Sequence, residues 1–175
     1  MSTPYTGKQP EGYTLDESKQ GVLYILELET TNRYAYWSTW ADKWWHRERS
    51  HTTRKRVRTE HFIKIGHSTR RYDYDTYERR KHHFELHGLR IVDECRVYEM
   101  REWHSAIENE LHAHWSEEFG YEPMWQGFSG YTECYVPELK SKLNVIDDMV
   151  RESVNRYIDE QIDLLESDRN AFWNV

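Results

Sequence analysis

Four polar residues have side chains that suit the hydrolysis of a phosphodiester bond. This reaction needs an activated water molecule, a metal ion, and cationic donors for the charge that develops on the phosphate. Glu108 offers hard oxygen ligands of the kind that Mg²⁺ prefers, and Arg79 can hold a phosphate through two parallel hydrogen bonds. Tyr24 can accept or relay the proton of the attacking water, and the ammonium of Lys64 can support the phenolate if both side chains share a face of a sheet. These four residues are therefore candidate catalytic residues, with Glu108 as the metal ligand.

Two further residues are candidates for substrate binding. His67 and Ser68 directly follow Gly66, which we expect to end a strand, so both would lie in a loop where the substrate approaches. Either side chain can bind a phosphate. The alternative for His67 is an ordinary exposed loop histidine, since loops are generally polar and exposed.

A transition-metal site is a rival hypothesis for the residues around Glu108. His104, Glu108 and His112 recur every four residues, so a helix would place all three on one face. Zinc-binding helices more often combine two histidines four residues apart with a carboxylate from elsewhere. The chain has 10 histidines, so such spacings also arise by chance. The alternative is that one of these histidines tunes Glu108 or contacts the substrate.

Apolar runs and turn residues predict the elements that must position these side chains. The predicted strands are 21–28, 62–66, 89–98 and a short edge strand at 132–136, and the predicted helices are 76–87, 101–119 and 137 to about 167. Thr76 and Gly88 are candidate caps of the first helix. The first two strands pair most simply as a hairpin. The sequence therefore predicts an α+β fold with a small central antiparallel sheet of about three strands, flanked by helices.

The length of 175 residues predicts one domain with appended segments. We divide the chain into a flexible N-terminal arm at 1–20, a main domain at 21–136 with a long basic, Trp-rich insertion at 30–60, and an amphipathic helix at 137–175. A helix of ~30 residues spans roughly 45 Å, which is longer than such a domain needs. Part of it is expected to meet a partner or a second copy, as in a homodimer. The alternative is that it lies across the sheet and completes the core.

The charge is distributed unevenly along the chain. The net charge is -7, but residues 43–83 contain 13 Lys+Arg and 5 Asp+Glu and therefore carry +8, leaving -15 for the remainder. Positive charge beside aromatic rings is typical of nucleic-acid binding, whereas the alternative is that the rings pack against the domain. The densest basic residues are Arg54, Lys55, Arg56 and Arg58, and the neighbouring aromatic residues are Tyr34, Tyr36, Trp37, Trp40, Trp44 and Trp45. The acidic remainder is expected to limit non-specific attachment to DNA.

Several classes of protein are excluded by composition and pattern. No apolar run approaches the ~20 residues of a membrane-spanning helix, and residues 1–20 contain no apolar signal-peptide core. Cys95 and Cys134 are too few and too far apart for a disulfide scaffold. We therefore expect a cytoplasmic protein with reduced thiols and no membrane partner.

Several short motifs occur in a fixed order on the predicted elements. They are Val22-Leu23-Tyr24 after Gly21, Lys64-Ile65-Gly66, an arginine within the first helix, Ala106-Ile107-Glu108 with Leu111, and Glu133-Cys134-Tyr135. Over roughly residues 21–136 this order resembles the GIY-YIG nuclease superfamily, whose first two strands carry Gly-Ile-Tyr and Tyr-Ile-Gly. A lysine in place of the second tyrosine is familiar from a phage-type branch, which also tends to end in a Glu-aromatic-Phe strand.

The resemblance implies a Mg²⁺-dependent DNA endonuclease acting in a bacterial or phage-infected cell. It implies Tyr24 as the proton acceptor, Lys64 as its electrostatic support and Glu108 as the metal ligand. The best register places the phosphate-binding arginine at Arg79, with Arg80 as the alternative. Such an enzyme could serve homing, restriction, repair or attack on a competitor's genome.

Two other functions are compatible with the same sequence. A non-catalytic module that binds nucleic acid or a protein is favoured by the replacement at Lys64 and by the lack of an obvious match to the asparagine that many family nucleases carry. Retention of Tyr24, Arg79 and Glu108 together argues against it. In a third hypothesis, the acidic remainder and the terminal helix form an interaction protein that occupies another protein's DNA site.

Overall fold

The computed structural model describes part of the backbone and a smaller set of side chains. The backbone is described for residues 3–4, 20–30, 34–36, 54–56, 59–69, 76–100 and 102–173, and the side chains for 20–30, 59–69, 76–100 and 102–168.

Three long antiparallel strands form the centre of the sheet. Strand β2 (Gly21–Thr30) lies between β5 (His61–Thr69) and β6 (Leu89–Met100), and it pairs with both. The register places Tyr24 opposite Gly66 on one side and opposite Val97 on the other. The predicted pairing of the first two strands as a hairpin is therefore confirmed.

Three strands of two residues each extend this centre. The order is β1-β6-β2-β5-β8-β7, in which β1 (Thr3–Pro4) is parallel to β6, and β8 (Cys134–Tyr135) pairs with β5 and with β7 (Gly120–Tyr121). The α+β class is confirmed, but the expected number of about three strands is wrong. The strand predicted at 132–136 exists as β8, but it does not lie at the edge of the sheet, because β7 pairs with its other side. Strands this short carry no periodicity that a sequence could reveal.

The basic insertion contributes a separate two-stranded sheet. Strand β3 (Tyr34–Tyr36) pairs antiparallel with β4 (Arg54–Arg56).

The helices begin and end close to their predicted boundaries. Helix α2 (Tyr77–Leu86) follows Thr76, whose side chain accepts a hydrogen bond from the Arg79 backbone N–H, so the predicted N-cap is confirmed. The C-cap is His87, and the expected cap Gly88 is the next residue, with φ of +79°. Helix α3 (His104–Phe119) starts later than predicted and ends at Gly120.

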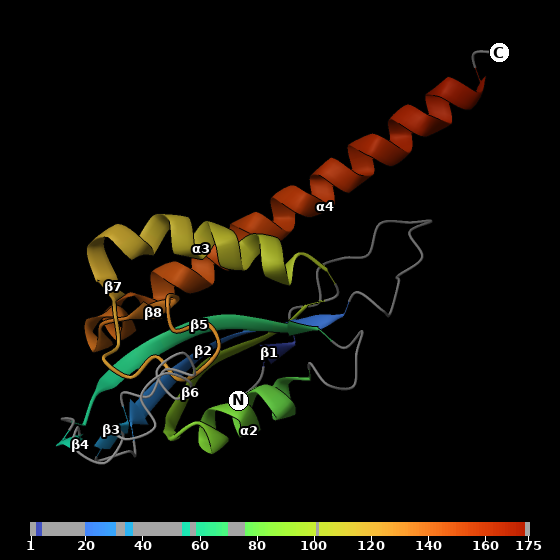
Figure 1. Cartoon of the computed structure of the whole chain (residues 1–175). Coiled ribbons are helices and arrows are strands. Elements are labelled where there is room, and N and C mark those ends of the chain that lie inside the picture. The colour runs from blue at the N-terminus through green and yellow to red at the C-terminus, as the bar shows by residue number, and fades with distance from the viewer. Residues whose placement is uncertain are drawn as a thin grey trace, which may run out of the picture.

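The C-terminal segment begins as a 3₁₀ helix, η2 (Pro137–Lys142), and continues as the helix α4 (Leu143–Trp173). The inner half of α4 lies over the sheet, whereas the outer half extends away from the sheet (Figure 1). Leu164 and Leu165 on this outer half are exposed. Among the described residues, no helix is both long and apolar enough to cross a membrane.

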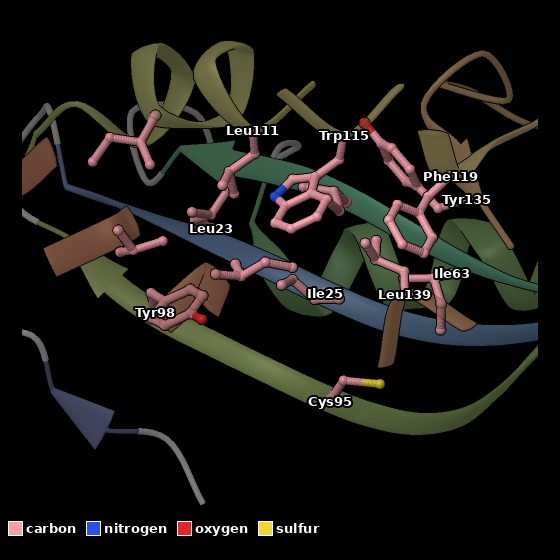
Figure 2. Packing of buried hydrophobic residues seen from close by; sticks show 14 of the residues in the cluster. Leu23, Ile25, Ile63, Cys95, Tyr98, Leu111, Trp115, Phe119, Tyr135 and Leu139 are labelled. Atoms are coloured by element: carbon pink, nitrogen blue, oxygen red, sulfur yellow. The ribbon is translucent and has the colours of Figure 1, made fainter. Parts of the chain in front are cut away.

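The sheet separates two hydrophobic clusters. Helices α3 and α4 cover one face and α2 covers the other (Figure 1). Successive residues of a strand point to opposite faces, so Leu23 and Ile25 pack under α3 and α4 while Tyr24 and Leu26 pack under α2. The first cluster also includes the predicted α3 stripe, of which Leu111 and Trp115 are visible above the sheet (Figure 2).

Candidate functional site

Glu108 is a buried carboxylate at the centre of a cluster of polar residues on the α3 face. It belongs to the helix that buries Ile107 and Leu111 in the core, so its position is fixed by the packing of α3. One carboxylate oxygen, Oε2, contacts Nδ1 of His67, and the other, Oε1, lies 3.5 Å from Nε2 of His112. Burial alone would raise the pKa of Glu108, but His112, His67 and the positive charge of Lys64 together lower it to about 2. Glu108 is therefore ionised at neutral pH.

Aromatic contacts orient the two histidines beside Glu108. The ring of His67 stacks on His104 with centroids 5.3 Å apart, and the ring of His112 stacks on Tyr135 at 5.8 Å. Nδ1 of His112 also contacts the Tyr135 hydroxyl. The histidines that flank Glu108 are thus held in defined orientations.

His67 and Ser68 do not lie in a loop, so that prediction is wrong. Both belong to β5, which continues to Thr69 because it remains paired with the start of β2. Ser68 is buried, whereas the His67 side chain is partly exposed. The ordinary loop histidine is likewise excluded, because His67 is held against Glu108 by the strand.

Lys64 is the most buried charged residue of the site, with 2% of its surface exposed. Its Nζ donates hydrogen bonds to the backbone oxygen of Ile65, at 2.8 Å, and to Oε2 of Glu133, at 2.5 Å. The turn before Glu133 passes close to this pair at Gly130, which has φ of +75°. A Cβ at position 130 would lie 2.6 Å from Oε2 of Glu133 and 2.8 Å from Nζ of Lys64, so this backbone approach requires glycine.

Three side chains around Glu108 are close enough to hold a metal ion. Ligand atoms of Glu108, His112 and Glu133 all lie within 4.8 Å of one another. His104 does not belong to this group. The third member is Glu133, whereas the rival zinc hypothesis expects His104. Two carboxylates and one imidazole form a chemically reasonable set of ligands for a divalent cation.

Tyr24 lies under α2, on the other face of the sheet from Glu108. Its ring packs against Tyr77 and Phe84, with centroids 5.5 Å and 6.4 Å away, and it crosses over Gly66 of the neighbouring strand. Lys64 alternates with Ile63 and Ile65, so it leaves β5 on the same face as Tyr24. Lys64 and Tyr24 therefore share a face of the sheet, which is what the predicted support of Tyr24 by Lys64 requires.

The two candidate arginines of α2 differ in position. Arg79 is exposed, whereas Arg80 is half-buried and lies four residues before Phe84, which faces the sheet. Burial, His87 and then the charge of Arg80 lower the pKa of His83, and Nε2 of His83 accepts a hydrogen bond from the Ser129 backbone N–H at 3.2 Å. Arg80 is therefore the less exposed of the two and lies on the side of α2 that faces the sheet.

A buried carboxylate that sequence reasoning missed holds the loop next to the site. Glu60 accepts hydrogen bonds from the Tyr121 hydroxyl at 2.6 Å, from Met124 N at 2.8 Å and from Trp125 N at 3.2 Å. This loop leads to Gly130 and Glu133. The only sequence signal is a carboxylate immediately before an apolar strand.

A second group of possible metal ligands already shares a lysine ammonium. Glu27, Asp93 and Cys95 lie close together, but Nζ of Lys140 is 2.6 Å from Glu27 and 3.4 Å from Asp93. We treat this group as structural.

Most of the predicted nucleic-acid-binding segment lies outside the described residues. Arg54, Lys55 and Arg56 form strand β4, whose backbone alone is described. Arg58 and the tryptophans of the insertion lie outside.

Comparisons with known proteins do not identify a relative. No family model matches the chain, and neither the curated proteins nor the solved structures contain a match.

Proposed function

We propose that the chain is a divalent-metal-dependent DNA endonuclease whose active site lies at the edge of β5. The observation that carries the proposal is the ionised, buried Glu108 beside His112 and Glu133, with the ammonium of Lys64 next to them. A buried, ionised carboxylate next to a buried ammonium is expensive to maintain for stability alone. Their chemistry is that of metal-assisted phosphate hydrolysis.

A divalent cation fits the residues around Glu108. The carboxylates of Glu108 and Glu133 would hold it, and Mg²⁺ is commonly bound by one or two carboxylates with water and substrate phosphate. When bound, the ion would polarise the phosphate and activate the attacking water.

The cations around the site would hold the substrate. Arg80 offers a planar guanidinium for a phosphate, with Arg79 as the more exposed alternative. His67 is partly exposed beside Glu108 and can donate to a phosphate oxygen, and the neighbouring Ser68 supports the strand from a buried position. Arg54, Lys55, Arg56 and Arg58 would extend the contact along the DNA backbone.

The predicted role of Tyr24 is to accept the proton of the attacking water. Because Tyr24 and Glu108 lie on opposite faces of the sheet, this role requires the substrate to reach both faces at the edge of β5. Tyr24 shares its face with Lys64, and a positive charge there would favour the phenolate, although the Lys64 ammonium is hydrogen-bonded to Glu133 and to the Ile65 carbonyl. The order of Tyr24, Lys64, an arginine on α2 (Arg79 in the best register, Arg80 as the alternative) and Glu108 along the chain is the order that the GIY-YIG resemblance implies, which adds support to this assignment.

A plasmid-nicking assay tests the proposal. Wild type is expected to nick supercoiled DNA with Mg²⁺ and to be inactive with EDTA. Glu108→Gln keeps the side-chain shape and is expected to lose on the order of 10³-fold in rate. Glu117→Gln is the matched control, because Glu117 is an exposed carboxylate on the same helix. A folded Glu108→Gln protein that cleaves as fast as wild type would remove the proposal.

One observation favours a non-catalytic binding module instead. Both carboxylates already have protein partners, His67 for Glu108 and Lys64 for Glu133. In that case wild type would bind DNA in a salt-dependent way without cleaving it, with or without a divalent cation.

The expected homodimer and the cytoplasmic location remain predictions. The exposure of Leu164 and Leu165 on the outer half of α4 is compatible with a contact to a second copy.

A further inference from the structure

We infer that Glu108, His112 and Glu133 form a three-ligand centre that prefers a first-row divalent transition metal to Mg²⁺. This inference deepens the proposed function and rests on it for the catalytic role of the ion, whereas the test below measures binding. It adds His112 as a metal ligand to the two carboxylates, Glu108 and Glu133, of the proposed function.

The first argument concerns the direction in which the two ring nitrogens of His112 point. Its Nδ1 is turned to the Tyr135 hydroxyl, which leaves Nε2 directed at Glu108. Nε2 is buried and makes no hydrogen bond among the described residues, although Oε1 of Glu108 is only 3.5 Å away. In the tautomer with the proton on Nδ1, which donates to the Tyr135 oxygen, the Nε2 lone pair is directed at Oε1 of Glu108. A cation between these two atoms binds both of them, and it takes the place of the His112 interaction that lowers the pKa of Glu108 when no ion is bound.

The second argument concerns the groups behind the ligands. Metal-bound histidines almost always hydrogen-bond through their other ring nitrogen, and metal-bound carboxylates usually carry a further hydrogen bond. His112 has this support from Tyr135, and Glu108 has it from His67, which contacts the oxygen that faces away from His112. His67 is supported in turn by its stacking on His104. The ligand orientations are therefore set before an ion binds.

Glu133 is the ligand on the solvent-exposed side of the group. Its side chain is 40% exposed, so water and a phosphate can reach an ion held there. Its Oε2 accepts from Lys64, and a carboxylate has enough lone pairs to keep this bond and to ligate a metal. Gly130 leaves the space in which Glu133 and Lys64 meet. Three protein ligands with an open side are typical of a catalytic metal site.

The imidazole determines which metal is preferred. Mg²⁺ binds oxygen ligands and releases its water reluctantly, so a nitrogen ligand adds little to its affinity. First-row transition metals bind imidazole well, and Mn²⁺ also accepts carboxylates and water. Mn²⁺ is the probe of choice because its binding can be followed by electron paramagnetic resonance.

The experiment titrates Mn²⁺ into the full chain in the absence of DNA. Wild type is expected to bind about one Mn²⁺, and Mg²⁺ should displace it only at concentrations at least about tenfold higher. His112→Gln and Glu133→Gln are each expected to weaken Mn²⁺ binding by about tenfold or more. His114→Gln, an exposed histidine on the same helix, is the matched control and should bind as wild type does. Circular dichroism verifies that each variant is folded.

A measurement on wild type alone covers the case in which a variant does not fold. Pulsed electron paramagnetic resonance of the Mn²⁺ complex should show hyperfine coupling to a directly bound imidazole nitrogen. Absence of this coupling, or equal Mn²⁺ affinity in His112→Gln and His114→Gln, overturns the inference. If Mn²⁺ binds as expected but no cation supports cleavage, the metal centre stands and the nuclease proposal fails. If Mg²⁺ supports cleavage while Mn²⁺ shows neither preference nor nitrogen coupling, the nuclease proposal stands and the three-ligand centre fails.

Discussion

The phenol ring of Tyr24 lies directly over the Cα atom of Gly66 in the neighbouring strand. A Cβ atom at position 66 would be 2.5 Å from the phenolic oxygen and 2.8 Å from a ring carbon of Tyr24. Tyr24 is only 2% exposed and packs against Tyr77 and Phe84, so the ring cannot move aside without disturbing the α2 face of the core. The glycine after Lys64 and Ile65 is therefore required by the position of the tyrosine.

This contact predicts the effect of Gly66→Ala. The added methyl group must displace the Tyr24 ring, and such overpacking is expected to lower the free energy of unfolding by about 1–3 kcal/mol. If Tyr24 accepts the proton of the attacking water, the displaced hydroxyl should also reduce plasmid nicking. Urea unfolding and the nicking assay measure the two effects separately.

Tyr24→Phe distinguishes the chemical role of the hydroxyl from the packing role of the ring. This variant keeps the ring over Gly66 and should change the free energy of unfolding by no more than about 1.5 kcal/mol. Loss of a general base typically reduces a rate by about 10²–10⁴-fold. Cleavage at the wild-type rate by Tyr24→Phe would assign the proton transfer to another group.

The Lys64–Glu133 ion pair predicts that its two partners contribute unequally to stability. Lys64 is 2% exposed, whereas the Glu133 side chain is 40% exposed. Glu133→Ala leaves a buried ammonium that still donates to the Ile65 carbonyl but has lost its carboxylate partner, which should cost about 3 kcal/mol. Lys64→Met leaves Glu133 to be solvated by water and removes only one of the groups that keep Glu108 ionised, so the cost should stay below that of Glu133→Ala. Chemical unfolding of both variants checks the order, and a greater loss in Lys64→Met would contradict it.

The low pKa of Glu108 predicts how stability depends on pH. Burial alone would raise the pKa, but His112, His67 and Lys64 lower it from 4.5 to about 2. Because the folded pKa lies below the unfolded value, the stabilisation is fully present above about pH 5 and is lost as the pH falls from 4.5 toward 2. The stability difference between wild type and Glu108→Gln should therefore shrink on acidification, by on the order of 2 kcal/mol between about pH 6 and pH 3. Urea unfolding in EDTA measures this, and a constant difference would show that Glu108 titrates normally.

The elements that carry Tyr24, Lys64 and Glu108 could be predicted because each lies within a strong apolar pattern. Alternation along β2 and β5 predicts which faces Tyr24 and Lys64 occupy. The four-residue spacing of apolar residues along α3 predicts its buried side, and Glu108 lies next to that side. The difference in exposure between Arg79 and Arg80 could also have been predicted, because Phe84 lies four residues after Arg80 and marks the buried side of α2.

The rest of the site depends on contacts between distant segments. β5 continues through His67 because it is paired with β2, and no local pattern requires a strand there. Glu133 reaches the site because Glu60 holds the loop before it through Tyr121 and two backbone N–H groups. Pairing length and loop anchoring of this kind are tertiary effects that local propensity does not report.

The basic strand β4 predicts the salt dependence of DNA binding. If Arg54, Lys55 and Arg56 each neutralise one phosphate, replacing all three by alanine should lower the slope of log K against log salt concentration by about 3. Binding should weaken similarly for DNA of different sequences, since phosphate contacts carry no sequence information. Fluorescence anisotropy across a salt series measures the slope, with Glu108→Gln as the background so that the DNA stays intact.

Arg151→Ala is the control for the loss of positive charge. Arg151 is exposed on α4, within the acidic remainder of the chain, and its guanidinium lies 2.7 Å from Asp148. Removing it changes the net charge without touching the basic segment, so the salt slope should remain that of the parent protein. An unchanged slope in the triple variant would place the phosphate contacts outside β4. A loss in Arg151→Ala of about one third of that in the triple variant, in proportion to the charge removed, would mean that DNA responds to the overall charge of the protein and not to a local basic surface.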